Sequence, residues 1–278
     1  MAEITAQAVK ELRDLTNLPL MEVKRALTEA NGDQARAIEI LKEANKKVSI
    51  KRAENATSEG LIRSGVSADG SRAAMVEIQC ESAPVAKADD FIFLADQCLK
   101  QLLEGPGATT AEELLAQPVP ARPGLTLAGL LEEVVGKIRE KMVVARVLRV
   151  TGPAGAYSHH DGKTGVLFQA SGENKTAPVL RDVAMHVAAL KPVVTQPEEL
   201  PAADVAAEKA RLTAEATASG KPANIIEKMV EGRMKTYYAE QGVLAFQLFA
   251  KDDSKTVNQA LAESGLKPAG FTRWLLGN

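Results

Sequence analysis

Residues 74–87 read Ala74-Met75-Val76-Glu77-Ile78-Gln79-Cys80-Glu81-Ser82-Ala83-Pro84-Val85-Ala86-Lys87. Apolar and β-branched side chains dominate the first part, which favours a strand buried on at least one face. Pro84 has no N–H to donate to a sheet and disfavours the helical conformation at the preceding residue. We therefore predict an exposed turn over residues 81–85, between this strand and the next helix.

The helix expected after the turn covers residues 89–103, because apolar side chains recur there at helical spacing. They are Phe91, Leu94, Ala95, Cys98 and Leu102. A turn held between a strand and a helix is a suitable place to present a contact to a partner. The alternative is an ordinary strand-to-helix connection, and the local pattern alone does not separate the two.

The overall composition is that of a soluble globular protein, with 278 residues, 45% hydrophobic, 25% charged and a formal net charge of −2. That charge gives no global field for nucleic acid or an anionic membrane. No stretch approaches the roughly 20 apolar residues of a membrane span, and residues 1–5 lack the pattern of a secretory leader. We expect a cytoplasmic protein that binds neither membranes nor, strongly, nucleic acids.

The first 54 residues are predicted to form three short helices and a linker. Asn31-Gly32 is a strong helix stop, and Asp33 is a strong cap for the helix that follows. After Leu41 the sequence turns polar and basic, which favours a partly helical linker that ends near residue 54. The three helices resemble a ubiquitin-associated-type domain, whose compact surface docks another protein; Lys24 lies outside its apolar face.

Beyond residue 54 the same order of predicted helices and strands occurs twice. Hairpin signals at Asp69-Gly70 and Asp161-Gly162 are each followed by an apolar helix. Each copy then has a further helix and a closing strand, expected at 142–150 in the first copy and at 243–249 in the second. We therefore predict an α+β fold with two related subdomains and antiparallel sheets, at residues 55–151 and 152–278.

An excursion interrupts the second copy at about residues 197–240. Two helical patterns, the first with a thin alanine-rich stripe, are joined by the turn Gly220-Lys221-Pro222. Helices joined by such a turn pair antiparallel, so we predict an inserted antiparallel coiled-coil hairpin.

Groups that could carry out catalysis are scarce. Cys80 and Cys98 have no partner at metal-ligand spacing and read as small buried hydrophobes. His159, His160 and Asp161 are adjacent, and successive strand residues point to opposite faces, which argues against a shared metal. His186 lies in an apolar helix, where a hydrogen-bonded structural histidine is expected. We predict no enzyme, no metal site and no cofactor.

Several long segments resemble bacterial elongation factor Ts, and the similarity covers nearly the whole chain. They are residues 21–33 (MEVKRALTEANGD), 185–192 (MHVAALKP), Lys221-Pro222 and residues 227–235 (EKMVEGRMK). The resemblance implies a guanine-nucleotide exchange factor that binds elongation factor Tu and promotes GDP release by disturbing its Mg and phosphate site. It implies no direct nucleotide binding by this chain.

The resemblance also places partner contacts. A Thr-Asp-Phe-Val loop of the family, which presses toward the Mg²⁺ region of its partner, corresponds here to Ser82-Ala83-Pro84-Val85. The position of the loop is kept, whereas its acidic and aromatic residues are not. An Ile-Gly contact pair becomes Ile138-Arg139, a Tyr-x-His motif is kept with His159, and Lys24 is expected to help docking.

Two alternatives remain open at this stage. One is an RNA-associated translation adapter without exchange activity, which would use the helical domain and the basic segment after Leu41. The other is an enzyme built around His159, His160 and Asp161, against which the strand geometry argues.

Overall fold

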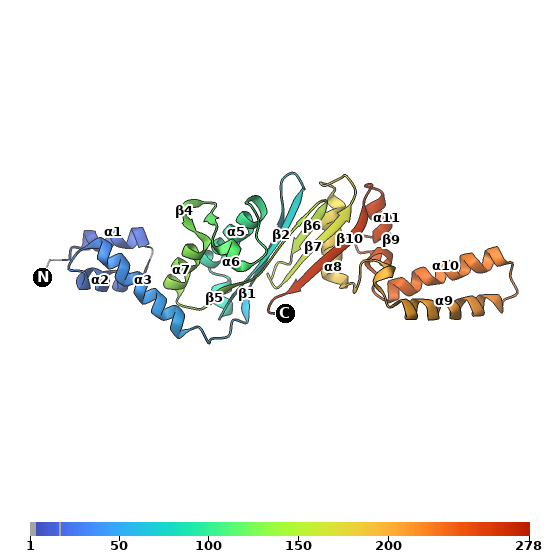
Figure 1. The fold of residues 1–278 in the computed structure, drawn as a ribbon, viewed down its shortest axis with the longest axis horizontal. Helices are drawn as coiled ribbons and strands as arrows, with labels where there is room; N and C mark the ends of the chain where they lie inside the picture. The colour runs from blue at the N-terminus through green and yellow to red at the C-terminus, as the bar shows by residue number, and fades with distance from the viewer. Residues whose placement is uncertain (1–3, 17) are drawn as a thin grey trace. The chain divides into compact units, whose positions relative to one another are not determined.

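The computed structural model describes residues 4–16 and 18–278. Residues 1–3, on which the leader expectation partly rests, lie outside the described part. The chain divides into two compact units. Unit 1 comprises Met1–Arg63, Val76–Arg149 and Leu275–Asn278, and unit 2 comprises Ser64–Met75 and Val150–Trp274. Figure 1 shows the fold of the chain and labels most of its helices and strands.

The N-terminal part of unit 1 contains α1 (Ala6–Thr16), α2 (Leu20–Glu29) and α3 (Gln34–Lys51). Asn31 and Gly32 adopt positive φ and end α2 as predicted, and the N–H of Gly32 donates to Leu27 O at 2.9 Å. Asp33 then caps α3 by accepting the N–H of Arg36 at 3.1 Å. Side chains of all three helices form a buried cluster that includes Leu12, Val23, Leu27, Ala37 and Leu41.

The segment after Leu41, predicted to be a partly helical linker, is helical as far as Lys51, because α3 continues without a break. Lysine, glutamate and alanine are good helix formers, so a polar composition does not exclude a helix. The extension also has a packing partner in α7 (Leu127–Ile138). A Cβ added at Gly136 of α7 would lie 2.3 Å from Asn45 Nδ2, so glycine permits the close approach of α3.

The rest of unit 1 is built around a sheet with the strand order β1 (Glu59–Val66), β2 (Arg72–Cys80) and β5 (Met142–Thr151). The connection from β2 to β5 carries α4 (Ala83–Ala86), α5 (Asp89–Glu104), α6 (Ala111–Leu115), the antiparallel pair β3 (Pro118–Val119) and β4 (Arg122–Thr126), and α7. The predicted apolar face of α5 is buried, including Phe91, Leu94, Cys98 and Leu102. These elements place the residues that follow β2 beside those that precede β5.

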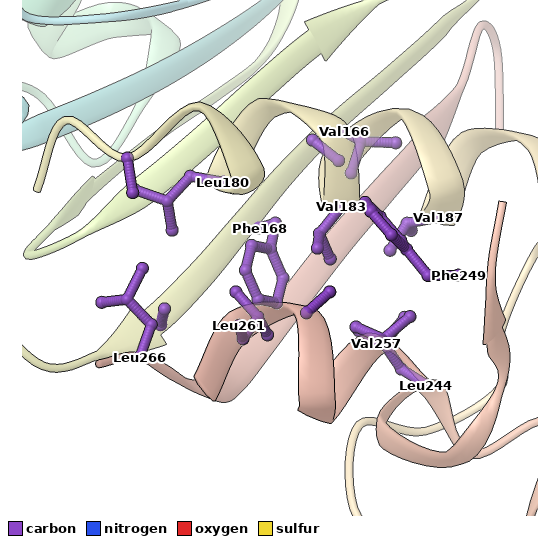
Figure 2. Packing of buried hydrophobic residues seen from close by; sticks show 14 residues of the cluster. Val166, Phe168, Leu180, Val183, Val187, Leu244, Phe249, Val257, Leu261 and Leu266 are labelled. Carbon is purple, nitrogen blue, oxygen red and sulfur yellow. The ribbon is translucent and has the colours of Figure 1, made fainter. Parts of the chain in front are cut away.

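The core of unit 2 lies between its helices and strands. The antiparallel hairpin of β6 (Ala154–Ser158) and β7 (Thr164–Ser171) is joined by β10 (Lys267–Leu275), in the order β10-β7-β6. Figure 2 shows the ring of Phe168 projecting from β7 between α8 (Pro178–Leu190) and α11 (Val257–Ala262), close to Leu261. Phe168, Val183, Val257 and Leu261 are completely buried.

The prediction of a closing strand at residues 243–249 is wrong. This segment forms the short helix η2 (Leu244–Phe246) and β8 (Leu248–Phe249), which pairs with β9 (Asp252–Thr256). The N–H groups of Leu244 and Ala245 donate to carbonyls of residues 194 and 195, at 2.9 and 3.2 Å, so they are unavailable to a sheet ladder. The strand that completes the sheet of unit 2 is β10, which follows α11.

The excursion in unit 2 begins with η1 (Pro197–Glu199) and contains α9 (Ala202–Thr217) and α10 (Ala223–Glu240), which lie side by side. Their contact is a separate small cluster of Leu212, Ala216, Val230 and Met234. The architecture is thus α+β with antiparallel pairing. Among the described residues, no helix is both long enough and apolar enough to cross a membrane.

Candidate functional site

The segment after β2 forms one turn of helix rather than an open loop. Ser82 has extended backbone angles and precedes α4, in which Pro84 occupies the first turn, where its missing N–H costs nothing. Ala83 and Pro84 are exposed. The prediction that residues 81–85 are all exposed is wrong for three of them: Glu81 and Ser82 are half-buried, and Val85 is 9% exposed and anchors the turn in unit 1. The segment therefore presents two adjacent side chains, Ala83 and Pro84.

The turn is tied to the start of β5 by two reciprocal sets of hydrogen bonds. Glu140 accepts the N–H of Ser82 at 3.1 Å and the Ser82 hydroxyl at 2.7 Å. Glu81, at the end of β2, accepts the N–H of Lys141 at 2.5 Å. Each side of the connection thus supplies a carboxylate to the backbone of the other, which fixes their relative position.

The carboxylate of Glu81 has further partners. Arg52 donates to its two oxygens at 2.9 and 2.8 Å, and Asn55 donates at 2.7 Å. The Lys141 N–H, followed by the Asn55 and Arg52 side chains, lowers the pKa of Glu81 below its usual value. Glu81 therefore stays ionised at neutral pH and holds the residues after α3 against the end of β2.

Ile138 and Arg139 lie at the end of α7, directly before Glu140, whose carboxylate is hydrogen-bonded to this turn. Ile138 is half-buried, and Arg139 adopts the left-handed conformation with φ 66° and ψ 29°. The Arg139 guanidinium forms an ion pair with Glu22 of α2. Within unit 1 the structure therefore brings together the turn at Ser82, the end of α7 and helix α2.

Lys24 lies on the same helix as Glu22 and is exposed. A shallow depression of about 390 Å³ is lined by Met21, Lys24, Arg25, Thr28 and Glu29. Met21 is 72% exposed, so a large apolar side chain lies beside two cations on the open face of α2. This combination suits docking of a protein surface.

His159 belongs to unit 2, separately from the residues above. It follows the end of β6, and the N–H of Gly162 donates to its carbonyl at 2.9 Å, which closes the predicted tight turn. Its Nδ1 lies 2.9 Å from the hydroxyl of Tyr157. This contact fixes the orientation of the imidazole ring.

The expectation that His159 and His160 point to opposite faces is wrong. Their ring centroids are 4.2 Å apart. The alternation of a strand does not apply, because β6 ends at Ser158 and the two histidines lie in the turn. Within residues 4–16 and 18–278, no group of three or more His, Cys, Asp or Glu residues is placed to hold a metal ion.

His186 is structural, as predicted. It is 1% exposed, its Nδ1 accepts the N–H of Ala250 at 3.1 Å, and its Nε2 lies 2.9 Å from Gln247 Oε1. Cys80 and Cys98 are buried and unpaired with each other. Burial raises the pKa of the Cys80 thiol to about 11 and that of Cys98 to about 12, so neither is a nucleophile at neutral pH.

Glu81 and Glu140 are part of the site but were not predicted as site residues from the sequence. Both flank predicted contact segments, since Glu81 precedes Ser82 and Glu140 follows Arg139. Their pairing could not be seen in the sequence, because Ser82 and Glu140 are 58 residues apart. Only the order β2 beside β5 brings them together.

Comparison with known proteins identifies the family to which this chain belongs. A family described as Elongation factor TS matches residues 81–278. The Elongation factor Ts of Paenarthrobacter aurescens (strain TC1) is 41% identical over 285 residues, covering 100% of both chains. Those of Polynucleobacter asymbioticus and Bordetella petrii are 39% and 41% identical over 278 residues, covering 100% of this chain and 91% and 92% of theirs. Both the family match and the full-length relatives show that this chain belongs to the elongation factor Ts family of translation elongation factors.

Proposed function

We propose that this protein is the guanine-nucleotide exchange factor of elongation factor Tu and that it acts by binding rather than by catalysis of its own. Membership of the elongation factor Ts family carries this proposal. The geometry of the site agrees with it, because the conspicuous features are docking surfaces and a firmly held turn. The protein would need no cofactor and would not bind the nucleotide itself.

Linkage explains how such a protein can release GDP without a catalytic group. A factor that binds the nucleotide-free GTPase more tightly than the GDP-bound form lowers the affinity for GDP by the same factor. GDP and Mg²⁺ are held through backbone amides, a lysine and polar side chains of the GTPase. A turn of the exchange factor that pushes these groups apart is sufficient to weaken the binding of GDP.

We assign this pushing role to residues Ser82–Val85. Ala83 and Pro84 are exposed, whereas Val85 is buried and Ser82 is hydrogen-bonded to Glu140. The turn carries neither an acidic nor an aromatic side chain, so its action would depend on backbone position and on the volume of the proline ring. Ile138, Arg139 and His159 would supply additional partner contacts.

The remaining parts have supporting roles in this proposal. Residues 1–54 would form a ubiquitin-associated-like docking domain with Lys24 at its contact surface. Residues 55–151 and 152–278 would be the two core subdomains, and α9 and α10 would form a coiled-coil hairpin that reaches a further part of the partner. The protein would act in the cytoplasm during translation elongation.

Release of a fluorescent GDP from purified elongation factor Tu tests the proposal. Substoichiometric amounts of this protein should accelerate release, since each molecule can act repeatedly. An unchanged release rate over a full concentration series would contradict exchange activity. Salt-sensitive binding to RNA in its place would favour the adapter alternative.

A further inference from the structure

Glu140 lies in the connection between α7 and β5 and holds the first residue of the proposed contact turn. One of its oxygens accepts the backbone N–H of Ser82 at 3.1 Å, and the other accepts the Ser82 hydroxyl at 2.7 Å. These two donors belong to different groups of the same residue. The carboxylate therefore fixes both the location and the orientation of Ser82.

The constraint continues from Ser82 into the exposed part of the turn. The carbonyl of Ser82 accepts the N–H of Ala86 at 3.3 Å, and that of Pro84 accepts the N–H of Lys87 at 3.2 Å. Val85 is buried, so the far end of the turn is also anchored. Ala83 and Pro84 are thus held at both ends, and a displacement of Ser82 would move them.

The two residues next to Glu140 in the chain are both held in place. Arg139 pairs with Glu22 of α2, and the N–H of Lys141 donates to Glu81 at 2.5 Å. Glu81 cannot replace Glu140 as the acceptor for Ser82 without giving up Lys141, Arg52 and Asn55. The carboxylate that orients the turn is therefore preset before any partner binds.

We propose that Glu140 is a positioning residue for GDP release, which keeps the turn at Ser82–Val85 in the orientation that acts on the nucleotide site of the partner. This inference rests on the proposed exchange function. Glu140 acts through Ser82 and need not touch the partner. Its loss should lower the efficiency of release within the complex and leave the affinity of the complex nearly unchanged.

The test compares Glu140→Ala, Glu140→Gln and Ser82→Ala in the full chain, with Glu132→Ala as the control. Glu132 is an exposed residue of the same helix that precedes Glu140, outside the turn and its hydrogen bonds. GDP release from elongation factor Tu is followed over a concentration series of each variant. The maximal rate and the half-saturating concentration are then obtained separately.

Glu140→Ala should lower the maximal rate about tenfold and change the half-saturating concentration less than about twofold, because small displacements of a positioning group cost up to about a hundredfold. Glu140→Gln should be intermediate, since its amide oxygen can still accept one bond. Ser82→Ala should also be intermediate, because it keeps the backbone N–H.

Hydrogen exchange of the isolated protein gives an independent readout. Glu140→Ala should speed exchange at the amides of Ser82, Ala83 and residues 85–87 and leave those of β6 and β7 unchanged. A maximal rate like that of the control variant, or a shift in the half-saturating concentration alone, would overturn the inference. Unchanged exchange at Ser82, Ala83 and residues 85–87 would overturn it as well. If the wild-type protein does not accelerate GDP release from elongation factor Tu, the proposed function itself is overturned, and with it the positioning role of Glu140.

Discussion

The guanidinium of Arg146 on β5 pairs with the carboxylate of Glu77 on β2, and Glu77 is completely buried. Arg146 Nε donates to this carboxylate at 2.9 Å. The side chain of Gln79 and the N–H of Gly277 donate to its other oxygen at 2.6 and 3.1 Å. Arg146 also donates to the carbonyl of Leu275 at 2.8 Å, so the cluster joins two strands and the last residues of unit 1.

Arg146→Met should destabilise unit 1 severely, because it leaves a buried carboxylate without its cation. Breaking a buried pair on one side costs about 3–5 kcal/mol. Urea unfolding followed by circular dichroism measures the loss, and hydrogen exchange assigns it to unit 1. The matched control is Arg122→Met, which breaks an exposed pair with Glu133 and should cost less than about 1 kcal/mol. Equal losses in the two variants would contradict the importance of burial.

His186 should make unit 2 less stable as the pH falls below about 6.5. Burial lowers the pKa of His186 in the folded protein, whereas the histidine of the unfolded chain keeps its ordinary value. Below that value the unfolded chain binds more protons, so stability decreases with falling pH by up to about 1.4 kcal/mol per unit. Above about pH 6.5 His186 is neutral in both the folded and the unfolded chain, so its contribution to stability no longer changes with pH.

Unfolding free energies measured between about pH 7 and pH 5 check this prediction, since most carboxylates titrate at lower pH. His186→Gln should flatten the pH dependence because glutamine does not titrate. A wild-type slope in His186→Gln would show that another group is responsible.

Pro84→Gly should slow GDP release by removing both the volume and the rigidity of the turn. Such backbone changes are worth about 0.4–1 kcal/mol, which corresponds to roughly two- to fivefold in rate. The control is Pro106→Gly, at an exposed proline between α5 and α6. Ala83→Asp with Pro84→Phe should shift the rate only modestly. Full activity of Pro84→Gly would exclude the turn as the working element.

His159→Ala should slow GDP release more than His160→Ala. The two rings are neighbours, but the Tyr157 hydroxyl lies 2.9 Å from His159 Nδ1 and orients that ring. Tyr157→Phe should therefore weaken exchange in the same direction, without removing the imidazole. The release rates of the variants are measured side by side. Equal effects of the two alanine variants would show that His159 and His160 are both ordinary surface histidines.

Replacing residues 209–234 by a short Gly-Ser turn should leave the rest of unit 2 folded. The deletion removes the four buried residues of the small cluster between α9 and α10 together, Leu212, Ala216, Val230 and Met234, and leaves of it only the partly buried Val205, Tyr237 and Tyr238. The melting temperature should fall by less than about 8 °C, equivalent to about 2–3 kcal/mol at this size. Phe168→Ala, in the main core, should lose about 3–5 kcal/mol and serves as the contrast. A larger fall in the deletion would show that the hairpin supports the core.

The features that the sequence predicted correctly are those that neighbouring residues determine. The hairpin signal at Asp161-Gly162 is confirmed, with Ser158 opposite Gly165. The stop at Asn31-Gly32 is confirmed by their positive φ values. The apolar periodicity of residues 89–103 gave the correct helix, because one face of α5 is buried.

The errors arose where distant contacts determine the structure. The strand β10 contains Pro268 and Gly270, which are typical of turns, and it forms because β7 offers a free edge. The sequence also did not show that the helical segment after Leu41 packs against α7 at Gly136. In the site, the resemblance located Ser82–Val85, but its support by Glu140 depends on the neighbouring positions of β2 and β5.

The bond from Gly277 to Glu77 joins residues 200 positions apart, and this has a consequence for folding during synthesis. Glu77 and Arg146 are made well before Leu275 and Gly277, and all of unit 2 from Val150 to Trp274 is made in between. Domains generally fold as their residues leave the ribosome, beginning at the N-terminus. Here the buried carboxylate lacks its last donor until Gly277 has been made, after the whole segment Val150–Trp274 of unit 2. Unit 1 therefore begins before this segment of unit 2 and is completed only after it.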